Sequence, residues 1–380
     1  MVTVRGTTQS FALMGAASAT VPASIPYRSA EIGVLSSELM LAVPLLFIGL
    51  LFGILTTPVL SKLIGINKQV KAALITQALG VLLIGIASSP TFFIFSASLL
   101  GFGFGQLEVL ITSIMRQISE NVGRSLTRIG AFLSSAAFLT PLLLMLANSL
   151  KLAFLINILT FFTSVYVAYI FTSPRFEVTS QNASLLKSKP TSVYFLLITS
   201  FCYVGAETIL SGWSAVFYEN NVSSKATIAP IGTSIFWFAL TLGRLIGTWS
   251  TNSGLSKKTV ALLWSFGFSI TLLNLFFLSG KSHGVLFLLV FILTVMFAGP
   301  CYGFLIGHAV SFFEAPQAVK SASLYVLVGA IGGSLIPLVI QLTASGNEQF
   351  VILGGAFSAL LGSIFLLMSF QEKATINPQS

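Results

Sequence analysis

The chain has 380 residues, of which 55% are hydrophobic and only 8% are charged, and its mean hydropathy is +0.95. Soluble domains carry roughly 25% charged residues, so this composition excludes a soluble domain and indicates an integral membrane protein. A bilayer core about 30 Å thick needs about 20 apolar residues for each helix, so twelve helices would use roughly 240 positions. The length therefore fits twelve helices joined by short loops.

Apolar runs bounded by charged residues and by Gly, Pro, Ser or Asn predict six spans in each half of the chain. In the first half the spans lie near 7–26, 37–60, 70–89, 91–117, 129–149 and 152–171. In the second half they lie near 192–217, 229–249, 258–279, 284–312, 321–343 and 349–370. The long polar segment 172–190 predicts a cytoplasmic linker between an N-terminal six-helix bundle, 1–171, and a C-terminal six-helix bundle, 191–380.

The first span also has a second interpretation. A basic start followed by an apolar stretch and small residues is the pattern of a cleaved signal peptide. The same segment carries Pro22 and Pro26, which weaken it as a helix. Its removal would leave eleven spans and spoil the division into two sets of six, so we favour a membrane span.

The basic residues indicate how the chain crosses the membrane, because Lys and Arg accumulate in cytoplasmic loops. With the N-terminus inside, fifteen of the 19 basic residues fall on the inner side, and the other four are Arg28, Lys151, Lys225 and Lys281. The prediction is a multi-pass protein of the plasma (inner) membrane with both termini in the cytoplasm. Topology accounts for most of the net charge of +9, and no basic cluster with stacking aromatics is evident. We therefore expect the lipid bilayer, and no nucleic acid, as a partner.

A fixed-offset similarity links two predicted inner loops. The segment 61–68 lies over 250–257, with Gly65 over Gly254 and Lys68 over Lys257, and both offsets are 189 residues. Duplication of a six-helix half is the simplest explanation. Two related halves about an axis along the membrane normal, with a substrate site between them, is the plan of the major facilitator superfamily.

These loops predict a cytoplasmic gate. Glycine permits a tight reversal between helices, and the cations can bridge helix ends of the two halves. Arg244 is the strongest member, because a charge at the end of an apolar helix is costly unless it snorkels or pairs. The alternative is that the basic residues only set topology. The predicted gate comprises Lys62, Gly65, Lys68, Arg116, Gly243, Arg244, Gly254 and Lys257.

Four segments carry a more specific resemblance. They are Phe201-Cys202-Tyr203-Val204-Gly205-Ala206-Glu207 followed by Trp213, Gly243-Arg244-Leu245-Ile246-Gly247-Thr248-Trp249, Gly103-Phe104-Gly105-Gln106-Leu107-Glu108, and Gly329-Ala330-Ile331-Gly332-Gly333-Ser334-Leu335-Ile336-Pro337. In these segments the chain resembles the fucose:proton symporter family within the major facilitator superfamily. The resemblance implies an all-α, twelve-helix, two-lobed transporter that works by alternating access, with helices one, four, seven and ten lining the cavity. It also implies a monomer.

The chain departs from that family at two places. The family's sugar symporters carry an acidic residue in helix one, whereas residues 11–20 contain none. Ser61 stands near the position where the superfamily usually has an aspartate in its first cytoplasmic loop. The apolar first helix favours the main alternative, an exporter of amphipathic compounds or drugs.

Two acidic residues stand apart from the other eight. Glu108 and Glu207 lie inside predicted spans, while the rest lie in loops or at helix ends. An ionised acid near the bilayer centre costs about 2.5 to 3.5 kcal/mol, so both are expected to face the interior. A carboxyl that is neutral when sealed and ionised when wet can couple transport to protons. We hypothesise that Glu108 is a protonation site and that Glu207 assists it or binds substrate. The alternative is that both are structural glutamates hydrogen-bonded to a neighbouring helix.

Polar and aromatic residues within the spans can supply hydrogen bonds and a stacking face for a small polar solute. Since the chain has 34 Phe, any one aromatic is more often a packing residue than a ligand contact. The candidate cavity residues are Gln106, Asn157, Tyr203, Trp213, Trp237, Asn274, Tyr302 and Tyr325.

Enzyme and cofactor motifs are not found in the sequence. Gly280-Lys281-Ser282 lacks the glycine that a phosphate loop requires five positions earlier, where Leu275 stands. The cysteines Cys202 and Cys301 have no metal-ligand spacing, and the two histidines, His283 and His308, lie too far apart in the sequence for a helical zinc motif. We therefore expect no enzyme and no cofactor. The sequence predicts a secondary active transporter of a small polar solute, sugars among the candidates, that is coupled to protons. A non-transporting receptor on the same fold is the third possibility.

Overall fold

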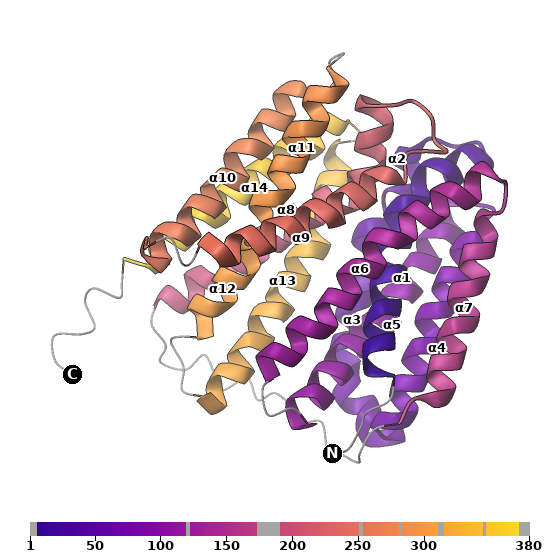
Figure 1. Ribbon diagram of the computed structural model, residues 1–380, viewed down its shortest axis with the longest axis horizontal. Coiled ribbons are helices and arrows are strands. Elements are labelled where there is room, and N and C mark those ends of the chain that lie inside the picture. The colour runs from indigo at the N-terminus through magenta and orange to yellow at the C-terminus, as the bar shows by residue number, and fades with distance from the viewer. Residues whose placement is uncertain are drawn as a thin grey trace. The chain divides into compact units, whose positions relative to one another are not determined.

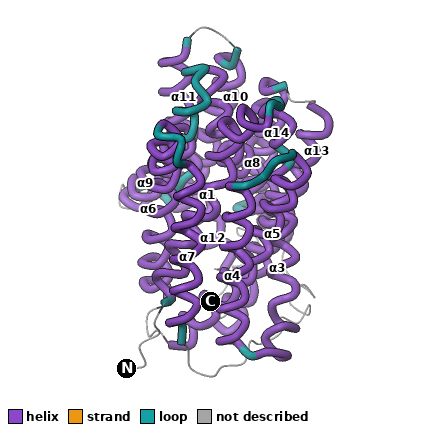
Figure 2. Tube along the Cα trace, turned by 90° about the vertical axis from the view of Figure 1, so that its right-hand side faces the viewer, coloured by secondary structure: helices purple, strands orange, loops and turns teal. Residues whose placement is uncertain are grey.

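The computed structural model describes residues 6–118, 122–172, 191–250, 254–280, 283–310, 315–344 and 347–371. These residues form helices joined by short loops (Figure 2). Residues 173–190 of the predicted linker lie outside the described residues. The first six helices are α1 (Thr7–Ile32), α2 (Ser36–Leu39), α3 (Ala42–Ile64), α4 (Ile66–Gly85), α5 (Pro90–Ile118) and α6 (Val122–Ser149). The other eight are α7 (Ala153–Ile170), α8 (Thr191–Asn221), α9 (Ile231–Ser250), α10 (Lys257–Leu278), α11 (Gly284–Ala298), α12 (Cys301–Val310), α13 (Ala315–Ala344) and α14 (Glu348–Ser369).

The fourteen described helices coincide with the twelve predicted spans, because α2 with α3 and α11 with α12 each occupy one span. Among the described residues, nine stretches are long and apolar enough to cross a membrane, and 154–170 and 231–247 are shorter apolar helices. The prediction of an all-α membrane protein with twelve helices is confirmed.

The first helix is longer than predicted. The expected end at residue 26 was wrong, since α1 runs through Pro22 and Pro26 to Ile32. Proline is tolerated in membrane helices whose neighbours surround them, and residues 19–27 are all buried. Gly33, with φ +79°, ends the helix.

The tenth predicted span, near 284–312, is found as one apolar stretch, Gly284–Ala309. Its helix breaks at Gly299 and Pro300, between α11 and α12. Proline has no N–H to donate to the carbonyl four residues earlier, which is that of Met296. The amide of Gly299 is shared instead between the carbonyls of Val295 and Met296, at 3.1 and 3.3 Å.

The chain forms two compact units. Unit 1 comprises Met1–Ser180 and Gly212–Trp237, and unit 2 comprises Gln181–Ser211 and Phe238–Ser380. The division passes through α8 and α9, both labelled in Figure 1, so the last third of α8 and the first part of α9 belong to unit 1. Within unit 1, the hydroxyl of Ser234 on α9 donates to the carbonyl of Phe138 on α6 at 2.8 Å. The hydroxyl of Ser36 on α2 donates to the carboxylate of Glu219 on α8 at 3.4 Å.

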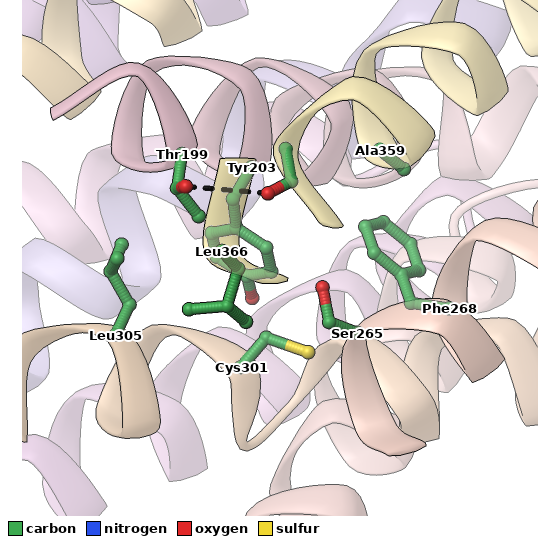
Figure 3. A pocket seen from close by; sticks show the side chains of 9 residues that line it. Thr199, Tyr203, Ser265, Phe268, Cys301, Leu305, Ala359 and Leu366 are labelled. Atoms are coloured by element: carbon green, nitrogen blue, oxygen red, sulfur yellow. Dashed lines mark hydrogen bonds between the residues drawn. The ribbon is translucent and has the colours of Figure 1, made fainter. Parts of the chain in front are cut away.

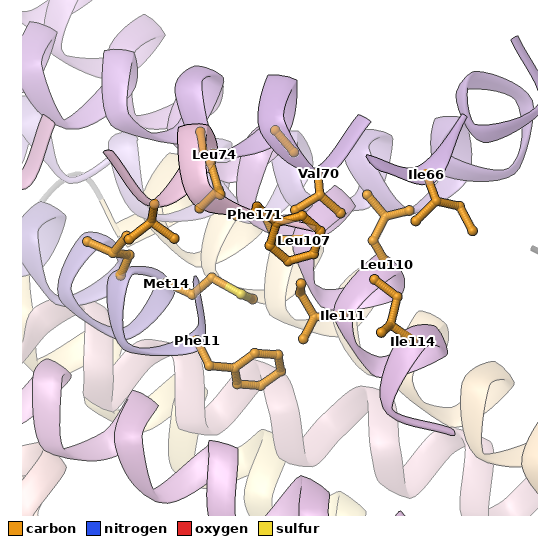
Figure 4. Close-up of a cluster of buried hydrophobic side chains, with 14 of the residues drawn as sticks. Phe11, Met14, Ile66, Val70, Leu74, Leu107, Leu110, Ile111, Ile114 and Phe171 are labelled. Atoms are coloured by element: carbon orange, nitrogen blue, oxygen red, sulfur yellow. The ribbon is translucent and has the colours of Figure 1, made fainter. Parts of the chain in front are cut away.

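Unit 1 has a continuous apolar core (Figure 4). Met14 of α1, Leu74 of α4, Leu107 of α5 and Phe171 after α7 are fully buried in it. Dispersion contacts and close packing hold such a core together in lipid, where the hydrophobic effect between helices is absent. The core fixes α1, α4 and α5 as one body, and α5 carries Gln106 and Glu108.

Glycines bring α3 and α5 into backbone contact. A Cβ placed on Gly101 would lie 1.9 Å from the carbonyl oxygen of Leu46, and one on Gly105 would lie 2.1 Å from that of Leu50. No heavy atom can occupy those positions unless the helices separate. Small residues therefore set the distance between these two helices, as is common in membrane helix pairs.

Gly105→Ala should destabilise the protein by about 1 to 3 kcal/mol, because the new methyl group meets backbone rather than a movable side chain. The measurement is the thermal unfolding midpoint of the purified protein in detergent. Gly130→Ala on α6 is the matched control, since nothing lies within 4 Å of its Cβ position. Its midpoint should be unchanged or slightly higher because alanine favours helix. Equal midpoints for the two variants would show that the α3–α5 contact is not tight.

The two loop glycines of the internal repeat have the same backbone conformation. Gly65 and Gly254 both have φ +79°, in the region that favours glycine, and no atom lies within 4 Å of either Cβ position. The expectation that these turns require glycine for a tight reversal is confirmed.

Unit 2 is held together by hydroxyl contacts as well as apolar packing. Ser265 and Ser269 of α10 lie 2.6 and 3.0 Å from the hydroxyl of Ser363 on α14. The hydroxyl of Ser358, also on α14, donates to the carbonyl of Cys202 on α8 at 2.8 Å. Buried hydroxyls must find partners in lipid, so these contacts fix α14 against α8 and α10.

Candidate functional site

The structure brings three predicted site residues of unit 2 together. The carboxyl of Glu207 on α8 lies within hydrogen-bonding reach of the phenol of Tyr203, one turn earlier on the same helix. Arg244 of α9 lies within electrostatic reach of both groups. Glu207 is partly buried and Tyr203 is buried. Arg244 itself is exposed, so a guanidinium at the surface of unit 2 lies within electrostatic reach of a partly buried acid and a buried phenol.

Aromatic rings surround this cluster. The ring of Tyr203 is stacked on that of Tyr302 of α12, with centroids 6.1 Å apart and an interplanar angle of 22°. It meets Phe268 of α10 edge to face, at 6.0 Å and 63°. Such arrangements are favourable aromatic geometries, and they fix the phenol so that its hydroxyl reaches the carbonyl of Ala298 at 2.8 Å.

A small pocket is lined by Tyr203 (Figure 3). Its wall includes Thr199 of α8, Ser265 and Phe268 of α10, and Cys301 of α12. The cavity measures about 10 Å³, which is roughly the room that one water molecule needs. It is too small for a transported solute, so it is a gap within the helix packing of unit 2.

Unit 1 contains a separate chain of polar side chains. The hydroxyl of Ser61, at the end of α3, donates to the amide oxygen of Gln69 on α4. The amide nitrogen of Gln69 donates to the amide oxygen of Gln106 on α5 at 3.2 Å. All three side chains are buried. The predicted cavity residue Gln106 is thus linked to the turn that carries the predicted gate residues Lys62, Gly65 and Lys68.

Glu108 lies near this chain along α5 but points elsewhere. It is partly buried. Residues two positions apart on a helix differ by about 200° around its axis. Glu108 therefore faces a different side of α5 from Gln106. The structure describes no group of three or more His, Cys, Asp and Glu residues that could hold a metal ion, within the ranges given above.

The remaining cavity candidates are dispersed. Asn157 is buried between α7 and α4, where its amide donates to the carbonyl of Val81 at 2.7 Å. Asn274 is exposed on α10 and donates to Ile270 of its own helix at 3.0 Å. Tyr325 is fully buried, and its hydroxyl donates to the carbonyl of Val193 at 3.3 Å. Trp213 is buried, and Trp237 packs edge to face on its neighbour Phe236, both within unit 1. Their assignment to the cavity stays a prediction.

The predicted gate residues differ in exposure and in the contacts that they make. Lys62, Lys68 and Lys257 are exposed at helix ends. Gly243 packs α9 against α11, because a Cβ there would lie 2.0 Å from the carbonyl oxygen of Met296. Arg116 is in helix α5, and its side chain lies outside the described residues.

Sequence reasoning missed Gln69 and Gln77. Both are buried on one side of α4, and Gln77 donates to the carbonyl of Leu13 on α1 at 3.1 Å. Their spacing of eight residues, two turns and a little more, places them on one helix face. That pattern was visible in the sequence. The bond from Tyr203 to Ala298 was not, because a backbone carbonyl leaves no trace in a residue pattern.

Gln69→Leu should lower the thermal unfolding midpoint, because Ser61 and Gln106 lose a partner while buried, at about 1 to 3 kcal/mol for each unsatisfied group. Ser61→Ala should cost less in the Gln69→Leu background than in the native protein, since interacting residues are not additive. Lys68→Leu, at the exposed neighbouring position, serves as the control. Full additivity would argue against a connected chain.

The family model of the Major Facilitator Superfamily matches residues 8–337 of this chain. The chain therefore belongs to the Major Facilitator Superfamily, and the resemblance seen in the sequence is confirmed at that level. A search of curated proteins gives no match.

Solved transporters share the fold. A nucleoside transporter superposes with a TM-score of 0.72 at 13% identity, covering 96% of this chain and all (100%) of its own. A D-xylose-proton symporter gives 0.73 at 14% identity, covering 95% of each chain. The fucose:proton symporter of E. coli gives 0.58 at 18% identity, covering 96% of this chain and 99% of its own. The chain is thus a multi-pass membrane protein with a transporter fold.

Proposed function

We propose that this protein moves a small polar solute across the membrane by alternating access and couples that movement to protons. The observation that carries the proposal is the cluster of Glu207, Tyr203 and Arg244, which places an ionisable acid beside a phenol and a guanidinium within membrane-spanning helices. Ionisable groups at such depth are costly and commonly mark substrate or proton pathways. Glu108 on α5 supplies a second partly buried acid.

The polar character of the solute is supported by the side chains near the cluster. The carboxyl of Glu207 is partly buried and the guanidinium of Arg244 is exposed, and hydrogen-bonding groups of this kind suit a polar molecule. Proteins described as a nucleoside transporter, a D-xylose-proton symporter and a fucose:proton symporter share the fold. We assign Glu108 as the protonation site and Glu207 as a group that assists it or binds the solute. The other predicted cavity and gate residues complete this proposal.

The proposal includes the cellular arrangement. It places a monomer in the plasma (inner) membrane, with both termini in the cytoplasm and two six-helix halves, 1–171 and 191–380, joined by the linker 172–190. The excess of basic residues in the inner loops supports that orientation.

Export of amphipathic compounds is the second candidate. One observation favours it: the described part of α1 presents no acidic side chain before Glu31. An apolar helix in that position suits an amphipathic solute better than a sugar.

Glu108→Gln should abolish proton movement that depends on solute. The purified protein is reconstituted in proteoliposomes that contain a pH-sensitive dye, and a panel of sugars, nucleosides and amphipathic drugs is added outside. The native protein should acidify the lumen with one class of solute. The variant should not, because a glutamine side chain cannot carry the proton.

Glu38→Gln is the control for loss of an acid as such. The carboxylate of Glu38 caps α2 by accepting from the amide of Leu35 at 3.0 Å, and glutamine can keep that bond. Solute flux without a pH change, equal in the native protein and Glu108→Gln, would refute proton coupling. Proton release from the lumen with drugs alone would favour export.

A further inference from the structure

The break between α11 and α12 exposes backbone carbonyls that side chains satisfy. The hydroxyl of Tyr203 on α8 donates to the carbonyl oxygen of Ala298 at 2.8 Å. The thiol of Cys301 donates to the carbonyl oxygen of Phe297 at 3.2 Å. A carbonyl left without a donor inside the membrane costs several kcal/mol. The hydrogen bond of Tyr203 therefore connects α8 to the end of α11.

The break also packs closely against α9. A Cβ on Gly299 would lie 2.6 Å from the carbonyl oxygen of Leu240 and 2.8 Å from the amide nitrogen of Arg244. A Cβ on Gly247 would lie 2.2 Å from the ring of Pro300. Because the backbone of Gly299 and the ring of Pro300 both pack on α9, we expect a change in the angle between α11 and α12 to move α9.

The same phenol lies within hydrogen-bonding reach of Glu207, so its one proton has two possible acceptors. When Glu207 is protonated, its hydroxyl can donate to the phenol oxygen while the phenol donates to Ala298. When Glu207 is ionised, it is an acceptor only, and a charged acceptor forms the stronger bond. The phenolic proton then turns toward the carboxylate, and the carbonyl of Ala298 loses its donor.

The groups that face this pair are few and belong to the elements packed around it. Arg244 of α9 stabilises the ionised carboxylate by its charge, and Cys301 of α12 lies within electrostatic reach of both Tyr203 and Glu207. Tyr302 of α12 and Phe268 of α10 contribute ring faces and edges to Tyr203. The phenol can thus exchange partners by rotating its O–H bond while the ring stays packed.

We propose that Tyr203 is a positioning residue that holds the α11–α12 break in its present geometry while Glu207 is protonated and releases the break when Glu207 ionises. The proton lost by the carboxyl passes to water that reaches it, and the phenol keeps its own proton throughout. This inference rests on the proposed function, because it gives the proton a structural consequence in the transport cycle.

A native cysteine can be used to measure how often the α11–α12 break opens. It has two cysteines, and Cys301 is the first residue of α12, in the wall of the pocket beside Tyr203 (Figure 3). In a Cys202→Ala background, the rate at which a small maleimide labels Cys301 in detergent-purified protein measures how often the break opens. Each rate is normalised to complete labelling of the denatured sample, and only monodisperse protein is compared.

Tyr203→Phe should raise the labelling rate about three- to tenfold, the range expected for one lost hydrogen bond. Tyr325→Phe is the matched control, because it removes a hydroxyl from a buried tyrosine of the same unit that also donates to a backbone carbonyl, that of Val193. Its rate should stay within about twofold of the background protein. Equal acceleration by both variants would overturn the proposal, since loosening of unit 2 would then explain the result.

A second comparison does not depend on Tyr203→Phe. Glu207→Gln keeps a donor toward the phenol but cannot ionise. We divide the labelling rate of the Cys202→Ala background by that of the same background carrying Glu207→Gln. This ratio should rise from about one at low pH to threefold or more at high pH. The effect of thiol titration on labelling is the same in both proteins and cancels in the ratio. In the Tyr203→Phe background the ratio should stay near one at every pH. A flat ratio in the presence of Tyr203, or a rising ratio in its absence, would overturn the proposal.

The labelling experiment needs no solute and no proton gradient. Its outcome is therefore separable from that of the transport assay. Loss of the pH-dependent ratio with intact proton-coupled flux would remove only the role of Tyr203. A rising ratio without any flux would leave the conformational link standing and remove the proposed transport.

Discussion

Polar groups within the bilayer core have no water to bond with, and the structure depends on the partners that they find inside the protein. Helices satisfy most backbone groups by themselves. The polar groups that helices do not satisfy by themselves lie where a helix is broken or where a polar side chain is buried. The carbonyl of Ala298 at the α11–α12 break takes its donor from Tyr203, and the amide of Asn157 is fixed on the carbonyl of Val81. Long-range hydrogen bonds therefore join buried polar side chains to backbone carbonyls of neighbouring helices, both at the α11–α12 break and within unbroken helices.

The same constraint separates the polar groups of the two units. In unit 1, uncharged amides and hydroxyls link α3, α4 and α5 through Gln69. In unit 2, hydroxyls of α10 and α14 pair with one another, and the ionisable cluster of Glu207 and Arg244 lies beside Tyr203. Neutral networks lock helices together at little electrostatic cost, whereas a buried carboxyl can change its charge. A group that changes its charge is suited to drive a conformational step, and a neutral network is suited to transmit it.

Glycine sets the distances over which these groups act. Gly105 brings α5 onto α3, and Gly243 brings α9 onto α11, in each case with backbone against backbone. Helices in such contact move as pairs. A change at the α11–α12 break is thus transmitted to Arg244, whose own helix is packed on that break. Membership of the Major Facilitator Superfamily gives this arrangement its context, since transporters of that fold alternate between conformations.

The sequence by itself determined the fold class, the twelve spans, the special glycines Gly65 and Gly254, and the two acids inside spans, because hydropathy, helix length and turn chemistry are local properties. It also pointed to Tyr203, Glu207 and Arg244 without showing that they meet. Only the tertiary structure decided that α1 continues through Pro22 and Pro26, since burial among neighbouring helices overrides the local cost of proline. It alone joined Gln69 to Gln106 and Tyr203 to Ala298, because those bonds connect residues that lie 37 and 95 positions apart and depend on how the helices pack.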